Sequence, residues 1–470
     1  MQDRGELPGA GDQPDKFSQP VRFADVMGAM MRKKTITNSR RQQIASATLR
    51  AGKFAACLII LLFAAAALGS DRFPRPEFQT GYEIPPNELG VARAAFLFYI
   101  DAAVLFAALC AASYLVLKKR SRKGVLALML FSAVYFGFYK KGCVCSLGSI
   151  QNITAAVFSN YQVSITVFLI FALPLVFALF FGRVFCSGVC PLGALQDIAA
   201  VRAKKVPARL SAVLGFIPHI YLGLAILFAA TGGGFIICRF DPFVGIFRLS
   251  APFGMMLVSV GILLLGIFIA RPYCRYLCPY GVILGWMSAF SKYRVKICSA
   301  TCAGCRLCEN SCPADAILPP TTDPVNEERS RSLLRLKTYI ALLPVWIIAG
   351  AAAGWFSADI VSSFHPDVKL LRVVELDQAG AAGARSLESE GLRIDAEVIT
   401  VLRARSDAAK KSFKLGMVIL GVYLGIVAGA RSIRRSTFKK RACYEADPVT
   451  CVSCGRCYGY CPKGTNSAIQ

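Results

Sequence analysis

Long apolar segments constrain the fold of this chain more than any other feature of its sequence. Hydrophobic residues make up 55% of the 470 residues and charged residues only 17%, which is too apolar for a soluble globular protein. Eight segments are long enough, or nearly so, to cross a hydrocarbon core of about 30 Å as helices. We therefore expect an all-α polytopic membrane protein with about eight transmembrane helices, at residues 54–69, 94–117, 124–139, 163–181, 210–230, 252–270, 339–356 and 413–430.

The basic residues predict how these helices are oriented. The net charge of +26 comes from clusters between the apolar segments, which is typical of membrane topology and argues against a nucleic-acid partner. By the positive-inside rule the clusters face the cytoplasm, and both termini lie there. Lys140 and Lys141 run against the rule. The domain organisation that we expect has these parts: a disordered cytoplasmic tail (1–50), a domain of six spans (51–296), a first cluster segment (297–320), a seventh span (336–356), a small extracytoplasmic domain (357–412), an eighth span (413–430) and a second cluster segment (440–470).

The chain has 19 cysteines, and two groups of them have a spacing that is specific for iron–sulfur clusters. Each group reads C-x2-C-x2-C-x3-C-P, as in ferredoxins that bind two [4Fe-4S] clusters. We call them the first run and the second run; they comprise Cys302, Cys305, Cys308 and Cys312, and Cys451, Cys454, Cys457 and Cys461. The alternative is that the same thiols bind zinc, and this spacing disfavours it.

The fourth cysteine of such a run ligates the other cluster in two-cluster ferredoxins. We therefore expect Cys461 to complete the cluster of Cys302, Cys305 and Cys308, and Cys312 to complete that of the second run. This exchange requires the chain to cross the membrane twice and return between the runs, as the predicted topology does. In the alternative, Cys298 and Cys443 act as local fourth ligands. The expected product is a small cytoplasmic ferredoxin-like module with two [4Fe-4S] clusters.

A second cysteine pattern occurs twice, each time at the end of an apolar segment. These two CxxxCP repeats are Arg183-Val-Phe-Cys186-Ser-Gly-Val-Cys190-Pro191 and Arg271-Pro-Tyr-Cys274-Arg-Tyr-Leu-Cys278-Pro279. Cysteines four apart share a helix face, so two such helices present four thiols to an additional metal centre or cluster. Buried free thiols are the alternative.

A fainter copy of this pattern predicts thiols on the opposite face. Cys143-Val-Cys145-Ser-Leu-Gly148-Ser-Ile-Gln151 matches Cys190-Pro-Leu-Gly193-Ala-Leu-Gln196, and Cys238 precedes Arg-Phe-Asp241-Pro242 on the same side. The pattern resembles an inverted repeat of helix hairpins. We expect Cys143, Cys145 and Cys238 to be outer redox thiols, with a disulfide, a partner's ligand or simple packing as alternatives, and Cys57 and Cys110 to be core residues.

Other cofactor signals are weak. The two histidines, His219 and His365, cannot supply bis-histidine haem within the membrane, and no C-x-x-C-H motif for covalent haem is present. His219 is more typical of a packed side chain than of a quinone ligand. Asp101 lies at membrane depth, so it is either functional or hydrated near the interface.

Together, the CxxxCP repeats and the two runs resemble the membrane polyferredoxins of the NosR and NapH type. The resemblance covers about residues 124–316 and the C-terminal tail. It implies a multi-pass protein of the bacterial inner membrane, ligation of clusters by the eight cysteines of the runs, and a redox role for the CxxxCP cysteines. The flavin-domain threonine motif of one group is missing here, and the runs are not in tandem.

The leading functional hypothesis is electron transfer by an oxidoreductase component that is not a stand-alone enzyme. Its expected partners are a cytoplasmic donor or quinol, a periplasmic redox partner such as a flavoprotein, and the lipid bilayer. A metal-assembly factor for a periplasmic metalloenzyme, with Cys143, Cys145 and Cys238 handling a soft metal, is the first alternative. A redox sensor is the second.

Overall fold

The computed structural model describes residues 95–142, 145–159, 162–201, 205–248, 253–297, 302, 304–321, 326–378, 396–436, 441 and 443–461. All of them belong to the unit that begins at Asn87. The expected tail (1–50), the first expected span (54–69) with Cys57, and Cys143 and Cys298 lie outside these residues.

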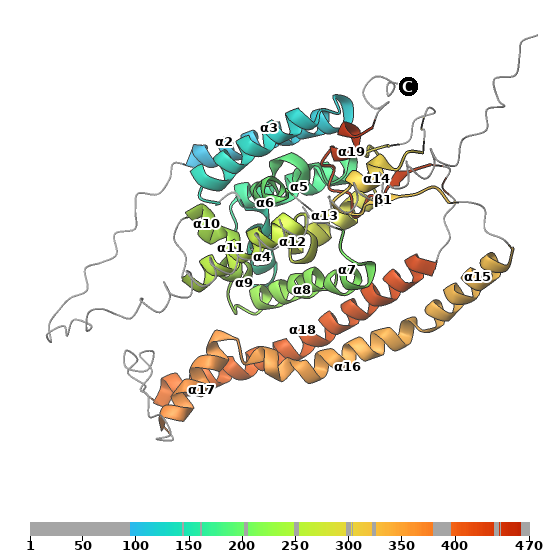
Figure 1. Ribbon diagram of the computed structural model, residues 1–470. Coiled ribbons are helices and arrows are strands. Elements are labelled where there is room, and N and C mark those ends of the chain that lie inside the picture. The colour runs from blue at the N-terminus through green and yellow to red at the C-terminus, as the bar shows by residue number, and fades with distance from the viewer. Residues whose placement is uncertain are drawn as a thin grey trace, which may run out of the picture. The chain divides into compact units, whose positions relative to one another are not determined.

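The described chain is mostly helical, as the sequence predicts (Figure 1). Proline opens several of the short helices, such as α6 and α13, because its fixed φ suits the first helical turn. The elements are α2 (Ala95–Ser113), η1 (Tyr114–Lys118), α3 (Arg122–Ser132), η2 (Ala133–Tyr139), α4 (Ser146–Phe158), α5 (Ile165–Phe181), η3 (Phe185–Val189), α6 (Pro191–Ala199), α7 (Ala208–Leu214), α8 (Ile217–Ala230), α9 (Ile236–Phe240), α10 (Pro242–Arg248), α11 (Phe253–Phe268), α12 (Pro272–Tyr276), α13 (Pro279–Ala289), α14 (Leu307–Ser311), β1 (Ile317–Leu318), α15 (Asn326–Ala341), α16 (Leu343–Ser362), α17 (Pro366–Gln378), α18 (Ala396–Ser436), β2 (Glu445–Ala446) and α19 (Arg456–Gly459), where η marks a π-helix.

Four helical stretches in the described chain are long and apolar enough to cross a membrane. They are Phe96–Lys118, Arg209–Ala230, Arg331–Ser362 and Glu397–Arg434. Two shorter apolar helices, Ile165–Phe181 and Phe253–Phe268, coincide with expected spans, and residues 124–139 form α3 and η2. The apolar composition is thus accompanied by helices long enough to span a membrane, while the count of eight spans stays a prediction.

The segment expected to be a small domain is built differently. Helix α16 continues through residue 357 to Ser362, and α18 begins at Ala396 rather than near residue 413. Between them α17 packs against α18, and residues 379–395 lie outside the described chain. Helical extensions and one additional helix therefore occupy most of the described part of 357–412.

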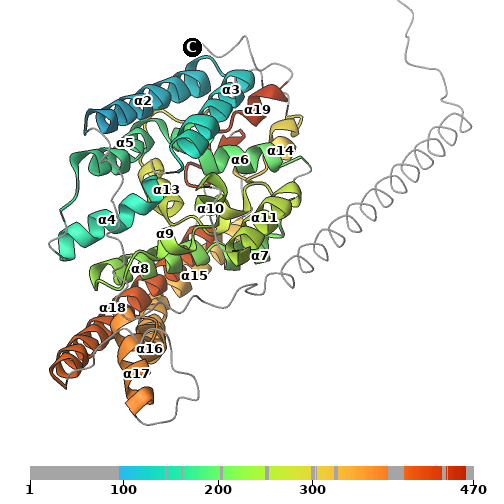
Figure 2. The same cartoon turned by 90° about the vertical axis from the view of Figure 1, so that its left-hand side faces the viewer.

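Helices α16 and α18 pack closely along their length, as both views show (Figure 2). Glycines make this approach possible, because a Cβ at Gly350 would collide with the carbonyl of Gly421, and one at Gly354 with that of Met417. Gly350 and Gly354, like Gly421 and Gly425, have the four-residue spacing of close membrane helix pairs, a signal that was present in the sequence and that our predictions did not use.

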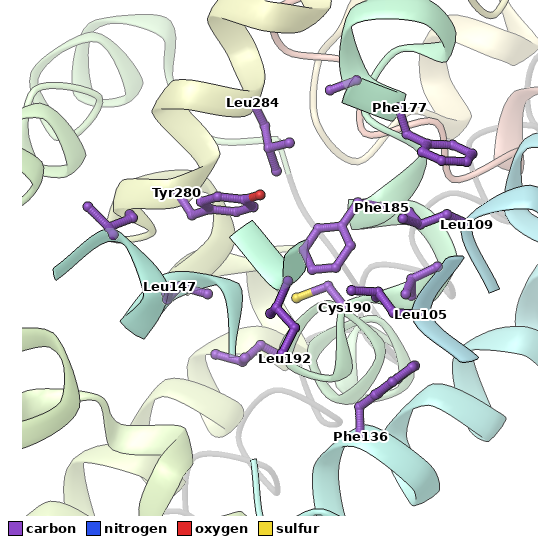
Figure 3. Close-up of a cluster of buried hydrophobic side chains, with 14 of the residues drawn as sticks. Leu105, Leu109, Phe136, Leu147, Phe177, Phe185, Cys190, Leu192, Tyr280 and Leu284 are labelled. Atoms are coloured by element: carbon purple, nitrogen blue, oxygen red, sulfur yellow. The ribbon is translucent and has the colours of Figure 1, made fainter. Parts of the chain in front are cut away.

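The principal core takes buried side chains from α2, α4, α5, α8 and α13, and also from η2, η3, α6, α9, α10 and α12. Its buried side chains include Leu105, Phe136, Phe185 and Leu284. The thiol of Cys190 lies among them, next to Phe185 and Leu192 (Figure 3). Cys145, Cys186 and Cys278 pack against the same core, so thiols from both expected faces belong to one hydrophobic body.

Candidate iron–sulfur sites

The two ferredoxin-type runs have the same backbone conformation, although their intervening residues differ. In both, the residues immediately before and after the second cysteine have left-handed φ angles: 64° at Gly304 and 59° at Arg306, and 53° at Ser453 and 71° at Gly455. Such alternation turns successive backbone N–H groups toward one side, as in the concave nests that surround iron–sulfur clusters. A short helix, α14 or α19, then carries the third cysteine.

A small sheet joins the two runs. Strand β1 follows the first run, strand β2 precedes the second, and they pair antiparallel with Ile317 opposite Ala446. The N–H of Asp447 donates to the carbonyl of Ala316 at 2.7 Å, and α14 contacts α19. Segments separated by α15, α16, α17 and α18 in the sequence therefore form one module.

The module contains a cavity whose lining includes four cysteines: Cys451, Cys454 and Cys457 of the second run, and Cys312 of the first. Apolar side chains such as Val295 and Ile317 also line it, together with Ser453 and Arg456. These are the four ligands that the ferredoxin spacing predicts for one of the two clusters, and the structure brings them together.

The donor chemistry of this cavity fits an iron–sulfur cluster. Burial raises the pKa of the Cys451 thiol to about 12 and that of Cys312 above its usual value, so cluster binding must displace protons from these sulfurs. Within the described residues, no three histidine, cysteine or acidic side chains are arranged to hold a single metal ion. A cubane has a different requirement, because its four cysteines bind four separate irons.

The other expected set is only partly assembled. Cys302 and Cys305 interact electrostatically with Cys308, whereas Cys461 is exposed after α19. Ligation by Cys461 therefore stays a prediction. Of the alternative local ligands, Cys443 is in a disulfide, and Cys298 lies outside the described residues.

The two CxxxCP repeats lie against α6, because η3 of the first repeat and α12 of the second both contact this helix. Cys190 interacts electrostatically with Cys186, Cys274 and Cys278. Cys190 and Cys278 each occupy the N-cap of the following helix, α6 or α13. The side chain of Gln196 fixes the second repeat: its Oε1 accepts from the Tyr273 N–H at 3.0 Å, and its Nε2 donates to the Cys274 sulfur at 3.3 Å.

The arginine that opens each repeat reaches into the other repeat. Nη1 of Arg271 donates to the carbonyl of Cys186 at 2.6 Å and would lie 3.7 Å from a Cβ at Gly193. In the reciprocal position, Nη2 of Arg183 would lie 3.1 Å from a Cβ at Gly281. A glycine after each Cys-Pro pair thus leaves room for the partner arginine, and the two repeats are interlocked.

Asp197 connects the CxxxCP site to the ferredoxin-like module. Its buried carboxylate lies 2.5 Å from Arg122, 3.1 Å from Arg456 and 3.4 Å from Arg271. Burial opposes its ionisation, but the three arginines dominate and lower its pKa to about 2. Arg122 also donates to the carbonyl of Cys454 at 2.8 Å. Our sequence predictions missed Asp197, since its partners come from three distant segments.

At the expected outer site, Cys145 is the N-cap of α4 and its sulfur accepts from the Gly148 N–H at 3.4 Å. Cys238, in α9, is exposed and lies near the same glycine. Buried Asp241, which our site predictions did not include, interacts electrostatically with both thiols. Cys143 lies outside the described residues.

The remaining candidate residues are Asp101, His219 and Cys110, and the structure shows what surrounds each of them. Buried Asp101 forms an ion pair with Lys140 at 2.7 Å, which neutralises one of the two lysines that run against the positive-inside rule. His219 lies among aromatic rings, those of Trp286 and Tyr423. Cys110 is exposed on the surface of α2, so it is not the core residue that we expected.

Comparison with known proteins adds independent support for iron–sulfur chemistry. A family model described as a 4Fe-4S binding domain matches residues 163–209 and 251–298. Each match contains one CxxxCP repeat, rather than a ferredoxin-type run.

Two curated proteins share shorter stretches. The chain is 39% identical over 59 residues to the putative electron transport protein YccM of Escherichia coli (strain K12), which is 12% of this chain and 16% of that protein. It is 43% identical over 51 residues to the uncharacterized protein MJ0749 of Methanocaldococcus jannaschii, 11% of this chain and 21% of that protein. The chain therefore matches only a small part of either relative. No solved structure matches it.

Proposed function

We propose that this chain is a multi-pass membrane protein that transfers single electrons through iron–sulfur centres. It connects a cytoplasmic donor or quinol with a periplasmic redox partner, and it is an oxidoreductase component rather than a complete enzyme. Two [4Fe-4S] clusters bound by the runs supply the one-electron carriers on the cytoplasmic side. The protein's own residues hold these centres close together and insulate them.

The observation that carries the proposal is the position of Arg271. Its guanidinium donates to the carbonyl of Cys186 in the first CxxxCP repeat at 2.6 Å and pairs with Asp197 at 3.4 Å. Asp197 also pairs with Arg122, which donates to the carbonyl of Cys454 in the second run. One polar network thus joins both cysteine sites. Because electron tunnelling falls steeply with distance, neighbouring centres are what a relay requires, and the 4Fe-4S domain match at the repeats supports a centre there.

Two tyrosine side chains lie near both the CxxxCP cysteine Cys278 and the outer thiol Cys145. Tyr273 interacts electrostatically with Cys278, Cys145 and Asp241, and Tyr221 has the same three neighbours together with Cys238. Both tyrosines thus lie near cysteines from the expected cytoplasmic and outer faces. In both views α6 lies between α19 and the pair α9–α10 (Figure 1, Figure 2).

The proposed placement is the bacterial inner membrane, with about eight spans and both termini in the cytoplasm. The four long apolar helices and the two shorter ones support the spans, and the basic clusters support the orientation. The resemblance to NosR and NapH proteins favours a periplasmic partner, for which a flavoprotein is a candidate, and the similarity to the putative electron transport protein YccM supports a role in electron transport.

Reconstitution into liposomes tests the proposal. Anaerobically purified full-length protein is inserted into vesicles containing ferricyanide, and dithionite is then added outside. The expected result is bleaching of the internal ferricyanide, with one electron taken up per ferricyanide, and much slower bleaching in the Cys274→Ser/Cys278→Ser double variant. Cys110→Ser is the matched control and should retain the wild-type rate.

Bleaching by wild-type protein no faster than in protein-free vesicles would contradict transmembrane electron transfer. If the double variant matched wild type while still reducing its ferredoxin-type clusters, transfer would bypass the CxxxCP site. EPR of the reduced samples separates that result from loss of the clusters.

A further inference from the structure

The segments that carry the outer thiols Cys145 and Cys238 share several local features with the CxxxCP repeats. In the CxxxCP repeats, Cys190 and Cys278 precede a proline that opens a helix. Asp241 likewise precedes Pro242, the first residue of α10, and its carboxylate accepts from the Phe243 N–H at 3.0 Å. An aspartate therefore precedes the helix-opening proline, as the second cysteine does in each CxxxCP repeat, although it follows Cys238 by three residues instead of four.

A pair of glutamines strengthens this correspondence. Gln196 accepts from the N–H of Tyr273, the residue before Cys274. Gln151, its counterpart in the fainter copy, accepts from the N–H of Ile237 at 2.9 Å, and Ile237 precedes Cys238. The two glutamines thus hold equivalent cysteine segments, α12 and α9.

The side-chain amide nitrogen of Gln151 has no hydrogen-bond acceptor among the described residues. Nε2 of Gln196 donates to the sulfur of Cys274, whereas Nε2 of Gln151 is fully buried and has no hydrogen-bond partner among the described residues. A buried amide donor without a partner costs free energy. Cys238 is the counterpart of Cys274, but its sulfur does not accept from this amide, so a sulfur of a bound group would satisfy it.

The two outer thiols converge on one glycine. The Gly148 N–H donates to the Cys145 sulfur, and a Cβ at Gly148 would lie only 3.2 Å from the Cys238 sulfur. Gly148 corresponds to Gly193, which leaves room for the side chain of Arg271 at the CxxxCP site. Asp241 is 2% exposed and interacts electrostatically with both thiols.

We propose that Cys145, Cys238 and Asp241 ligate an iron–sulfur cluster, with the Gln151 amide donating to one of its sulfurs. A carboxylate is a suitable ligand for iron but a poor one for Cu(I), which prefers thiolate and thioether. The donors are also not arranged around a single ion, which fits a cluster with one ligand per iron better than a copper-delivery site.

Iron and acid-labile sulfide are measured per chain in anaerobically purified full-length protein, with EPR after dithionite reduction. Asp241→Asn is expected to lose about three to four irons, the content of one cubane-type cluster, and to retain the ferredoxin-type signals. Asp241→Cys should restore the iron and shift the EPR spectrum. Asp359→Asn is the matched control, because that carboxylate is exposed on α16.

Iron content in Asp241→Asn equal to that of the wild type would overturn the proposal. If this variant does not fold, Cys238→Ser decides the question in the same way, since the exposed Cys238 tolerates a serine: loss of iron supports the cluster, and unchanged iron overturns it. None of these outcomes depends on electron transfer across the membrane, so this test and the liposome test fail separately.

Discussion

Arg271 donates a hydrogen bond to the backbone carbonyl of Cys186 at 2.6 Å, so the arginine that opens the second CxxxCP repeat is bonded to the first repeat. The same guanidinium lies against Asp197, which also holds Arg456 of the second ferredoxin-type run. The two cysteine sites are consequently parts of one polar network, and changes in the network are expected to affect both.

Replacing Asp197 by asparagine should weaken this connection strongly. The substitution leaves Arg271, which is 5% exposed, without its carboxylate, and breaking a buried ion pair costs about 3–5 kcal/mol. Thermal unfolding in detergent should show a lower midpoint. Asp407→Asn removes an exposed carboxylate from α18 and should change the midpoint little; equal effects of the two substitutions would contradict the role of the network.

The same carboxylate predicts a pH dependence. The arginines lower the pKa of Asp197 to about 2 in the folded protein, against about 3.9 in an unfolded chain. Its stabilising contribution, on the order of 2 kcal/mol, is therefore complete above about pH 4 and is lost as the pH falls toward 2. The stability difference between wild type and Asp197→Asn should stay constant from pH 7 to 5 and shrink below pH 4. A difference that already shrinks between pH 7 and 5 would refute this assignment.

The glycine contact between α16 and α18 should be sensitive to a single methyl group. Gly350→Ala places a Cβ against the backbone of Gly421, and such overpacking costs about 1–3 kcal/mol. Gly261→Ala in α11 is the control, since nothing lies within 4 Å of its Cβ position. Thermal unfolding should distinguish the two variants. Tolerance of alanine at position 350 would mean that the helices do not pack in this way.

Gln196→Leu should alter the CxxxCP site without removing a cysteine. The variant loses the donor to the Cys274 sulfur and leaves the buried Tyr273 N–H without its acceptor, at a cost of about 1–3 kcal/mol. Hydrogen bonds to sulfur tune the reduction potential of iron–sulfur centres, so a redox titration followed by EPR should show a lower potential for a centre at this site and unchanged potentials for the ferredoxin-type clusters. An unchanged titration would argue against a centre there.

Local sequence patterns predicted those parts of the structure that depend on neighbouring residues. Apolar length located α2, α5, α8 and α11, and the cysteine spacing led to the set that includes Cys312. Parts that depend on tertiary packing were not predictable in this way. The length of α18 beyond its apolar portion, the three arginines around Asp197 and the position of Asp241 beside Cys145 all arise from contacts between distant segments. The equivalence of Asp241 to a cysteine becomes visible only when the Gln151 and Gln196 contacts are compared.

The most direct test concerns the claim that the two distant runs form one module with exchanged ligands. Iron, acid-labile sulfide and EPR are measured for full-length Cys312→Ala, with Cys110→Ala as the control. The predicted result is loss or conversion of the cluster held by Cys451, Cys454 and Cys457, with up to about four irons lost per chain, although all three cysteines of that cluster are still present. Wild-type iron content and an unchanged spectrum in Cys312→Ala would contradict the exchange.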